Sequence, residues 1–382
     1  MKSIQKSIIE LLKILISIPS QAGINNQMNI LNVIDNWFSS HGMHGKILFK
    51  GKKPVAFLYD IIIDNELPTY CFNACIDTAH IGDTNSWENH PFLASEKDNW
   101  LFGRGAADSK VAVSIFANIA KSLISNENLL RSNISFLFDC DEHTGSFGGI
   151  KTYLKTHKNL KGVFIGYPGN NGIVSGSRGF YRAVISFFGV SEHSGRKSDN
   201  NENAIIKVSN FIQDIYAIPI KQFVNSSFPV PPKITITKIR GGYNFTVTPD
   251  KCIVDVDIRL TPLFTFNDAR QLINESIKKI DNLYSKKTVL TEKESWPAYY
   301  LDNNSYILNL IKNIASKQFG KQLPSIICGP SNIGNYLSIH GIDAVCGFGV
   351  TYENLHAANE GIDLDSINDI YYVYYELAKT LC

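Results

Sequence analysis

Hydrophobic residues in the first part of the chain form nearly continuous runs that alternate with helical patterns. The clearest runs are residues 55–63, 70–76, 135–138 and 162–165. Such runs are typical of strands buried on both faces, and their alternation with helices favours a sheet sandwiched between helices. The expected helices are residues 1–19, 28–40, 111–123 and a segment from 148. We predict an α/β fold with a mostly parallel, mixed sheet.

The spacing changes in the middle of the chain. Residues 180–190, 233–239 and 251–260 alternate between apolar and polar positions, and helical patterns lie at 203–216 and 267–280. Alternation indicates strands with one solvated face, so these segments predict a small α+β, ferredoxin-like domain.

The alternation of apolar strands and helices seen in the first part of the chain then resumes towards the C-terminus. Expected strands lie at 324–327 and 344–348, and expected helices lie at 304–319, 332–340 and 366–381. An insertion that interrupts a larger domain explains this order. We predict a discontinuous domain of residues 1–176 and 292–382, and an inserted domain of residues 177–291.

Composition limits the functions that this chain can have. It has 382 residues, 44% of them hydrophobic, and a formal net charge of +2, so it can bury a large core and has no nucleic-acid footprint. Charges at Lys6, Glu10 and Lys13 interrupt the N-terminal apolar pattern, which favours a surface helix over a signal peptide, and no run is long enough to span a membrane. An Asn-rich stretch at 199–203 predicts a loop.

Cysteine usage points to a reducing compartment. The seven cysteines are an odd number, form no CxxC pair and mostly lie in apolar runs. Buried, reduced thiols are the usual state of such residues, so we expect a cytoplasmic protein.

Residues with chemical potential gather at the ends of the predicted strands. Cys75 and Asp77 lie at the end of one run, the Asp141-Glu142-His143 segment follows another, and Asp108 lies in a glycine-rich turn before a helix. In α/β sheets, ligands bind beyond the carboxyl ends of strands. Together with His356, which lies near the end of the chain, these residues are too many to be explained by helix capping alone.

Asp108, His143 and His356 predict a metal site. Two imidazoles and a carboxylate suit zinc, iron, manganese or cobalt and leave positions open for water and substrate. The alternatives are a helix cap for Asp108, a backbone-bonded histidine at 143 and an ordinary loop histidine at 356.

The order of these segments resembles the M20 metallopeptidase family, which includes acetylornithine deacetylase and succinyl-diaminopimelate desuccinylase. That family has H-x-D, then GRG-x-x-D-x-K, then D-E-E-x-G-S, then an acidic residue before Pro, then a late His. The second element matches fully at residues 103–110, and the others match in part. The resemblance implies a zinc-peptidase-like catalytic domain with an inserted lid and dimerisation domain, and therefore a homodimer.

The resemblance also implies two ligand sets around a shared Asp108. One would be Cys75, Asp108 and Tyr167, and the other would be Asp108, His143 and His356. Three of these positions differ from the family pattern, namely Cys75, His143 and Tyr167. A thiolate can replace an imidazole, but a phenol with a pKa near ~10 is a poor replacement for a carboxylate. We therefore favour one divalent ion over two, with zinc first and manganese or cobalt as alternatives.

Further roles follow from the same resemblance. Glu142 matches the general base, and Asp77 matches the aspartate that orients a metal-binding imidazole, although Cys75 stands where that imidazole would be. In the inserted domain, His193 matches a residue that stabilises the oxyanion. Asn244 and Arg259 match residues that bind the carbonyl or carboxylate of the substrate.

Some of these residues have simpler explanations. Asp77 could cap a strand end, and His193, Asn244 and Arg259 could be an ordinary sheet-edge histidine, turn asparagine and surface arginine. The segment from Gly329 to Ser331 opens a predicted helix, where free backbone N–H groups would favour an anionic substrate group. It could equally be a plain turn.

The sequence thus predicts a hydrolase that cleaves the amide bond of a small N-acyl amino acid or dipeptide-like substrate with a free carboxylate. One alternative is a homologue that does not hydrolyse, either a binding protein or an enzyme of amide formation or acyl transfer, because three ligands have changed. Another is cysteine chemistry, with Cys75 as a nucleophile activated by His143.

Overall fold

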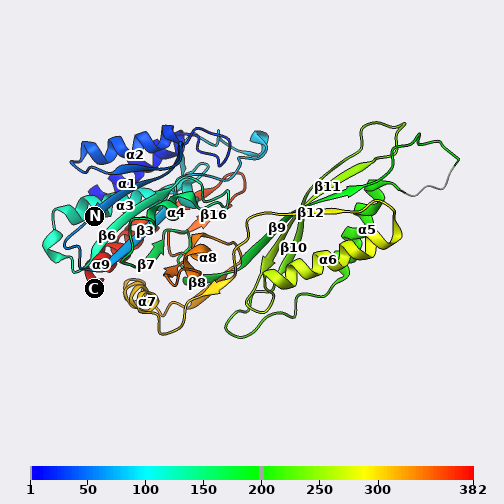
Figure 1. Ribbon diagram of the computed structural model, residues 1–382. Helices are drawn as coiled ribbons and strands as arrows, with labels where there is room; N and C mark the ends of the chain where they lie inside the picture. Colours follow the sequence, from blue (N-terminus) through cyan, green and yellow to red (C-terminus); the bar gives the residue numbers. More distant parts are fainter. Residues whose placement is uncertain (1, 198–201) are drawn as a thin grey trace. The chain divides into compact units, whose positions relative to one another are not determined.

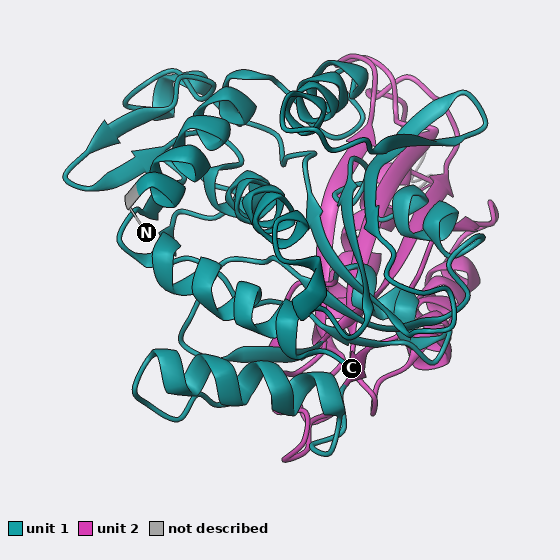
Figure 2. Ribbon diagram, turned by 90° about the vertical axis from the view of Figure 1, so that its left-hand side faces the viewer, with its two compact units in different colours: residues 1–176, 301–326, 332–382 teal, residues 177–300, 327–331 magenta. Residues whose placement is uncertain are grey.

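The computed structural model describes residues 2–197 and 202–382, so most of the expected loop at 199–203 lies outside the described residues. Figure 2 shows the two compact units into which the chain divides. Unit 1 comprises Met1–Gly176, Leu301–Ile326 and Asn332–Cys382, and unit 2 comprises Ser177–Tyr300 and Ile327–Ser331. Unit 2 therefore includes residues 292–300 and 327–331, which our boundaries place in the larger domain.

A six-stranded mixed sheet forms the centre of unit 1. Its order is β1-β2-β6-β3-β7-β15; the β6–β3, β3–β7 and β7–β15 pairs are parallel, and the β1–β2 and β2–β6 pairs are antiparallel. The strands are β1 (Lys46–Lys50), β2 (Lys53–Ile61), β3 (Thr69–Cys75), β6 (Asn133–Asp139), β7 (Leu160–Ile165) and β15 (Asp343–Val345). The prediction of a mostly parallel mixed sheet is confirmed.

Helices cover both faces of this sheet because its strands are apolar on both sides (Figure 1). On one face, Phe72 of β3 contacts Phe116 of α3 and Tyr374 of α9, with ring centroids 5.5 and 6.0 Å away. On the other face, Tyr153 of α4 donates a hydrogen bond to Ser135 of β6. The helices of unit 1 are α1 (Lys2–Ser17), α2 (Met28–Ser40), α3 (Val111–Ile124), α4 (Gly148–Tyr153), α7 (Tyr306–Gln318), α8 (Ile333–Ser338) and α9 (Ser366–Thr380). Within the described ranges, no helix is long and apolar enough to cross a membrane.

A second, small sheet lies in unit 1, and the hydrophobic pattern did not predict it. It has the order β16-β17-β5-β4, and its strands are β4 (Ser95–Lys97), β5 (Trp100–Phe102), β16 (Tyr352–Glu353) and β17 (Gly361–Asp363). Gly361 of β17 pairs with Phe102 of β5. This pairing places the loop of His356 beside the turn of Asp108, although the two are distant in sequence. Three further short strands are β8 (Ile173–Ser177), β13 (Tyr299–Tyr300) and β14 (Ser325–Cys328).

Unit 2 has the predicted ferredoxin-like architecture. Two helices and four strands follow one another in the order βαββαβ, and the antiparallel sheet has the order β10-β11-β9-β12. The elements are β9 (Gly179–Phe188), α5 (Ala204–Ala217), β10 (Lys233–Gly241), β11 (Lys251–Leu260), α6 (Phe266–Leu283) and β12 (Val289–Glu292). Alternate residues of β9 and β11 are buried against the helices in a core separate from that of unit 1.

Candidate metal centre

Asp108 lies in the turn between β5 and α3, and its carboxylate is buried. Its Oδ2 atom lies 2.7 Å from Nε2 of His356 and 3.5 Å from Nε2 of His143. Its Oδ1 atom accepts a hydrogen bond of 3.4 Å from the thiol of Cys75. The two carboxylate oxygens thus face different neighbours, with both imidazoles on one side and the cysteine on the other.

Two groups of metal-binding side chains occur among the residues that the structure describes. One is Asp108, His143 and His356, and the other is Cys75, Asp77 and His143; in each group the ligand atoms lie within 4.8 Å of one another. Both ring nitrogens of His143 are buried, and the carboxylates of Asp77 and Asp108 lie 3.3 and 3.5 Å from them without well-formed hydrogen bonds. A buried imidazole beside carboxylates at such distances can be bound further by a cation. The donor set therefore fits a divalent metal ion.

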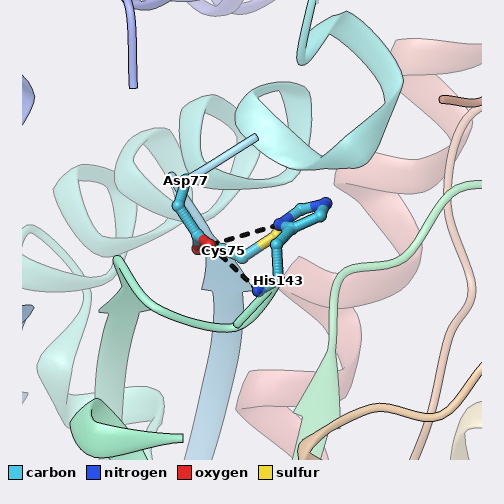
Figure 3. Close-up of side chains that lie close together, drawn as sticks. All are labelled: Cys75, Asp77 and His143. Atoms are coloured by element: carbon cyan, nitrogen blue, oxygen red, sulfur yellow. Dashed lines mark hydrogen bonds and ion pairs between the residues drawn. The ribbon is translucent and has the colours of Figure 1, made fainter. Parts of the chain in front are cut away.

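Asp77 orients His143 rather than a residue at position 75. Its two carboxylate oxygens accept hydrogen bonds from the backbone N–H groups of Glu142 and His143, at 3.1 and 2.9 Å. The Oδ2 atom also lies 3.3 Å from Nδ1 of His143, and Figure 3 shows the carboxylate and the ring facing each other. A carboxylate beside one nitrogen of a histidine directs the other nitrogen towards a metal. The predicted role of Asp77, to orient a metal-binding imidazole, is therefore possible with His143 as that imidazole.

Electrostatics at the centre favour a bound cation. Burial opposes the charged form of Asp108, but the attraction of His143 and His356 outweighs it. Burial likewise opposes the charged form of His143, but the attraction of Asp77 and Asp108 outweighs it. As a result the pKa of Asp108 lies below its usual range, and the pKa of His143 lies well above its usual range. The raised pKa favours the protonated form of His143, and a bound divalent cation would supply the same positive charge.

Glu142 is buried at the edge of this centre, and its Oε2 atom lies 3.6 Å from Nδ1 of His143. Burial, together with the charges of Asp108 and Asp77, raises the pKa of Glu142 to about 8, although His143 opposes the shift. A carboxylate whose pKa lies near neutrality can both take up and release a proton during catalysis.

Cys75 is the last residue of β3, and its environment keeps the thiol protonated. Its Sγ atom lies 3.4 Å from Oγ of Ser109, and its backbone N–H donates to the same hydroxyl. Burial, and next the charge of Asp108, raises the pKa of Cys75 well above its ordinary value. Because the thiolate is the reactive form, this setting speaks against Cys75 as a nucleophile.

A buried ion pair that sequence reasoning missed joins the two loops of the centre. Arg104 and Glu360 are each 1% exposed and lie 2.7 Å apart. The Glu360 carboxylate also accepts hydrogen bonds from the backbone N–H groups of Gly105, Ala107 and Asp108. Arg104 donates to the carbonyl of His356 at 3.3 Å. The pair therefore holds the turn of Asp108 against the loop of His356.

A lysine of the same turn anchors the centre to the first helix. The Nζ atom of Lys110 is buried and donates hydrogen bonds to the carbonyls of Leu15 and Ile18 at the end of α1. The lysine thereby helps to satisfy backbone carbonyls at the C-terminal end of α1. Tyr167, the remaining predicted ligand, follows β7 and packs against Gly347 and Gly349.

The predicted residues of unit 2 lie mostly on exposed turns. His193 forms an isolated bridge with Val247, and its Nδ1 atom accepts a hydrogen bond from the N–H of Gly195. The Asn244 side chain accepts hydrogen bonds from the N–H and hydroxyl groups of Thr246. Both contacts are local, and the role of these two residues in catalysis stays a prediction.

Arg259 and Ser331, in contrast, are brought together. The Arg259 guanidinium donates to the Ser331 hydroxyl at 3.1 Å and pairs with Asp257 at 2.8 Å. Arg178, which sequence reasoning missed, donates to the carbonyl of Gly329. Arg182 also pairs with Asp257, at 3.0 Å. We call Arg178, Arg182 and Arg259 with Asp257 the arginine cluster; its excess of guanidinium over carboxylate suits an anion.

Comparisons with known proteins give one consistent result. The model of a family described as peptidase family M20/M25/M40 matches residues 71–380. A succinyl-diaminopimelate desuccinylase of a Nitratiruptor species is 24% identical over 391 residues, which cover 98% of this chain and 99% of that protein. The M20 family metallo-carboxypeptidase Sso-CP2 of Sulfolobus solfataricus has a TM-score of 0.80 at 18% identity, over 97% of this chain and 98% of its own. The YXEP protein of Bacillus subtilis, described as a dinuclear metal-binding peptidase, has a TM-score of 0.70 at 15% identity, over 99% and 98% of the two chains.

Proposed function

The chain belongs to peptidase family M20/M25/M40 and is a metallohydrolase, and we propose that it cleaves the amide bond of a small N-acyl amino acid or dipeptide-like substrate with a free carboxylate. The observation that carries this proposal is the group of Asp108, His143 and His356, whose ligand atoms lie within 4.8 Å of one another. A buried imidazole beside a carboxylate and a second imidazole is suited to bind a metal ion.

The residues of unit 1 have separate tasks in this reaction. When bound at Asp108, His143 and His356, a divalent ion supplies polarisation of the scissile carbonyl and acidification of a water molecule. Glu142 takes the proton of the attacking water and passes it to the leaving amine. Asp77 holds the His143 ring in place through Nδ1 and holds the backbone of the same turn.

The arginine cluster binds the carboxylate of the substrate. The Arg259 side chain is already held by contacts with Asp257 and Ser331. It therefore loses little conformational entropy when an anion binds. Gly329 belongs to the same site through Arg178. Asn244 and His193 would stabilise the oxyanion of the tetrahedral intermediate. Because a similar protein is named a desuccinylase, N-succinyl amino acids are the first substrates to test.

A test of the general base decides the proposal. Glu142→Gln should abolish amine release from N-succinyl, N-acetyl and dipeptide substrates, while the circular dichroism spectrum and the metal content stay normal. Glu66→Gln, at an exposed turn position, is the matched control and should keep full activity. If the Glu142 variant hydrolyses any of these substrates at the unaltered rate, the assignment is wrong.

We further propose that the centre holds one ion, with zinc first and manganese or cobalt as alternatives. The support is chemical: Cys75 is a protonated thiol already engaged with Ser109 and Asp108, and Tyr167 is a phenol. Cys75→Ser should therefore leave the metal stoichiometry near one per chain, measured by plasma emission after dialysis. A fall from two ions to one in this variant would favour a dinuclear centre.

The alternative is a homologue that binds its ligand or transfers an acyl group without hydrolysis. The changed ligands at positions 75, 143 and 167 favour it. A purified protein that holds no metal, and that zinc, manganese and cobalt all fail to activate, would support this alternative.

We propose that unit 2 forms a homodimer through the edge of its sheet. The edge strand β10 and the turn after it expose Ile239 (52%), Tyr243 (76%) and Phe245 (101%). Exposed apolar groups beside an unpaired strand edge favour association with a second copy. Phe245→Asp should shift the molar mass measured by light scattering from dimer to monomer, whereas a wild-type monomer would exclude the proposal.

We also place the protein in the cytoplasm. All seven cysteines are free, and five of them are buried, which suits a reducing compartment. Fractionation of the source cells tests this placement.

A further inference from the structure

A cavity of about 380 Å³ lies on the outward face of the small β16-β17-β5-β4 sheet in unit 1. Its apolar walls are Trp87, Leu93, Trp100 and Phe102. Of the described residues, none of the predicted metal ligands lines it. Half of the four tryptophans of the chain thus line one cavity that the proposed hydrolysis does not use.

Strand alternation explains why the aromatic side chains face outward. Trp100 and Phe102 lie on one side of β5, whereas Leu101, between them, is fully buried on the other side. The Phe102 ring lies against Gly361 of the neighbouring strand, where a Cβ atom would come within 2.6 Å of the ring. The Trp100 and Phe102 rings are nearly parallel, at an interplanar angle of 22°. Together they form a flat aromatic floor.

The opposite wall of the cavity is fixed in position. The indole N–H of Trp87 donates a hydrogen bond of 2.9 Å to the carbonyl of Ile81. The guanidinium of Arg104 lies 5.1 Å from the centre of the Trp87 ring, and Arg104 is itself locked to Glu360. Because these contacts hold the ring, a ligand would meet a preformed surface rather than one that must be ordered.

Charge on the rim selects the ligand. Three carboxylates line the cavity, those of Glu88, Asp98 and Glu353, against the single ammonium group of Lys97. Lys97 lies 3.7 Å from Glu88, so it offsets only one of the three. Aromatic faces with excess negative charge attract cations through both Coulomb and cation–π interactions. A purely apolar ligand would gain nothing from this rim, and an anion would be repelled.

We propose that this cavity binds an organic cation, an ammonium group attached to an apolar body of roughly ten non-hydrogen atoms, a size that such a cavity holds. The inference does not depend on the proposed hydrolysis, since none of the proposed metal ligands or catalytic residues lines the cavity. The ligand class follows from the aromatic floor, the fixed Trp87 wall and the acidic rim.

A matched set of probes tests the charge requirement. Titration calorimetry and tryptophan fluorescence would follow 4-phenylbutylamine, 4-phenylbutanol and 4-phenylbutyrate, which share one apolar body and differ in charge. The amine should bind at least about 10-fold more tightly than the alcohol, and the carboxylate should not bind. The affinity for the amine should fall as salt is raised. Equal binding of amine and alcohol, or no binding of the amine at 10 mM, would overturn the proposal.

Variants locate the binding. Trp100→Leu should weaken binding of the amine about 10-fold, and Glu353→Gln should weaken it about 3-fold. Glu96→Gln is the matched control, because Glu96 lies between two cavity residues of β4 but pairs with Lys13 on the other side. Its affinity for the amine should equal that of the wild type.

Two outcomes of this series overturn the proposal even if Trp100→Leu fails to fold. One is an unchanged affinity in Glu353→Gln, which alters an exposed rim residue and should fold normally. The other is a loss of binding when Asp108→Asn replaces a residue of the metal centre, since that result would place the amine there.

Discussion

The metal centre of unit 1 and the arginine cluster of unit 2 are opposite in charge and in burial. Asp108 is 2% exposed and lies among buried groups, whereas the Arg259 side chain is 25% exposed. A buried charge depends on every neighbour that compensates it, but a partly solvated charge can lose a partner and turn to water. Substitutions should therefore disturb fold and chemistry together in the first region, and substrate binding alone in the second.

The sharpest test of this contrast is Asp108→Asn. The amide cannot replace a charged ligand that faces two imidazoles, so zinc affinity should fall on the order of 1,000-fold, beyond the roughly 10- to 100-fold effect of a supporting residue. Competition with a chromophoric chelator measures the affinity. Wild-type zinc affinity in this variant would remove Asp108 from the centre.

Glu360→Gln should show that the buried region couples stability to metal binding. The change leaves the guanidinium of Arg104 buried without its counter-charge, which should lower the free energy of unfolding by about 3 kcal/mol. Zinc affinity should fall about 10-fold, because the ligand loops lose their common support. Urea unfolding and chelator competition measure the two effects. Glu353→Gln, exposed on the same loop, should change stability by less than about 0.5 kcal/mol, and an equal loss in both variants would contradict the argument.

The Lys207–Glu202 ion pair of unit 2 tests whether the loss of stability on substitution depends on burial rather than on the unit in which a residue lies. Lys207 is fully buried, and its Nζ atom lies 2.6 Å from Glu202. Burial opposes ionisation of Glu202, but hydrogen bonds from Lys207 and Ser285 outweigh it and lower its pKa to about 2. Glu202→Gln should cost about 2 kcal/mol at pH 7.

The pH dependence of that cost has a definite sign. A depressed carboxylate pKa contributes stability above the unfolded value of 4.5 and loses it as the pH falls towards about 2. The difference in unfolding free energy between wild type and Glu202→Gln should therefore shrink between pH 5 and pH 2, measured by urea unfolding at each pH. Glu10→Gln, in the exposed pair with Lys6, should show almost no difference at any pH. A constant difference for Glu202→Gln would mean that its charge is not involved.

The smallest effect is expected in the arginine cluster itself. Arg259→Leu should raise KM for an N-succinyl amino acid about 10-fold, with kcat within about 3-fold, because the interaction serves the ground state and the transition state alike. Arg259→Lys should recover part of the affinity. Steady-state kinetics give both constants, and a loss confined to kcat would place Arg259 at the reacting atoms instead.

The long helices and strands, and the functional residues near their ends, could be predicted from the sequence. The continuous apolar runs of β3 and β6 and the alternation of β9 and β11 predicted the two sheets, since periodicity survives without knowledge of partners. His143 stood out because it follows a buried strand closely, and Asp108 stood out because it lies in a glycine-rich turn at the start of an apolar helix. The small sheet was missed because strands of two or three residues have no measurable period.

Contacts between distant segments were beyond that reasoning. Glu360 has no local signal, since most of its partners are backbone N–H groups in another loop. Asp77 seemed to have lost its target because the family pattern placed a histidine at position 75, whereas the ring of His143 supplies the target from the neighbouring strand end. Arg178 lies in a break between β8 and β9, and its hydrogen bonds to the carbonyls of Gly329 and Pro231 join segments that are distant in sequence.

The contact between Glu360 and the amide of Asp108 spans 252 residues of chain. During synthesis, the turn of Asp108 leaves the ribosome long before the carboxylate that organises it. A nascent chain that has not yet reached His356 and Glu360 would lack both a candidate ligand and this support, so it would be a poor competitor for a divalent cation. Metal binding would thus depend on synthesis having passed Glu360, and a product truncated before that residue would not hold the ion.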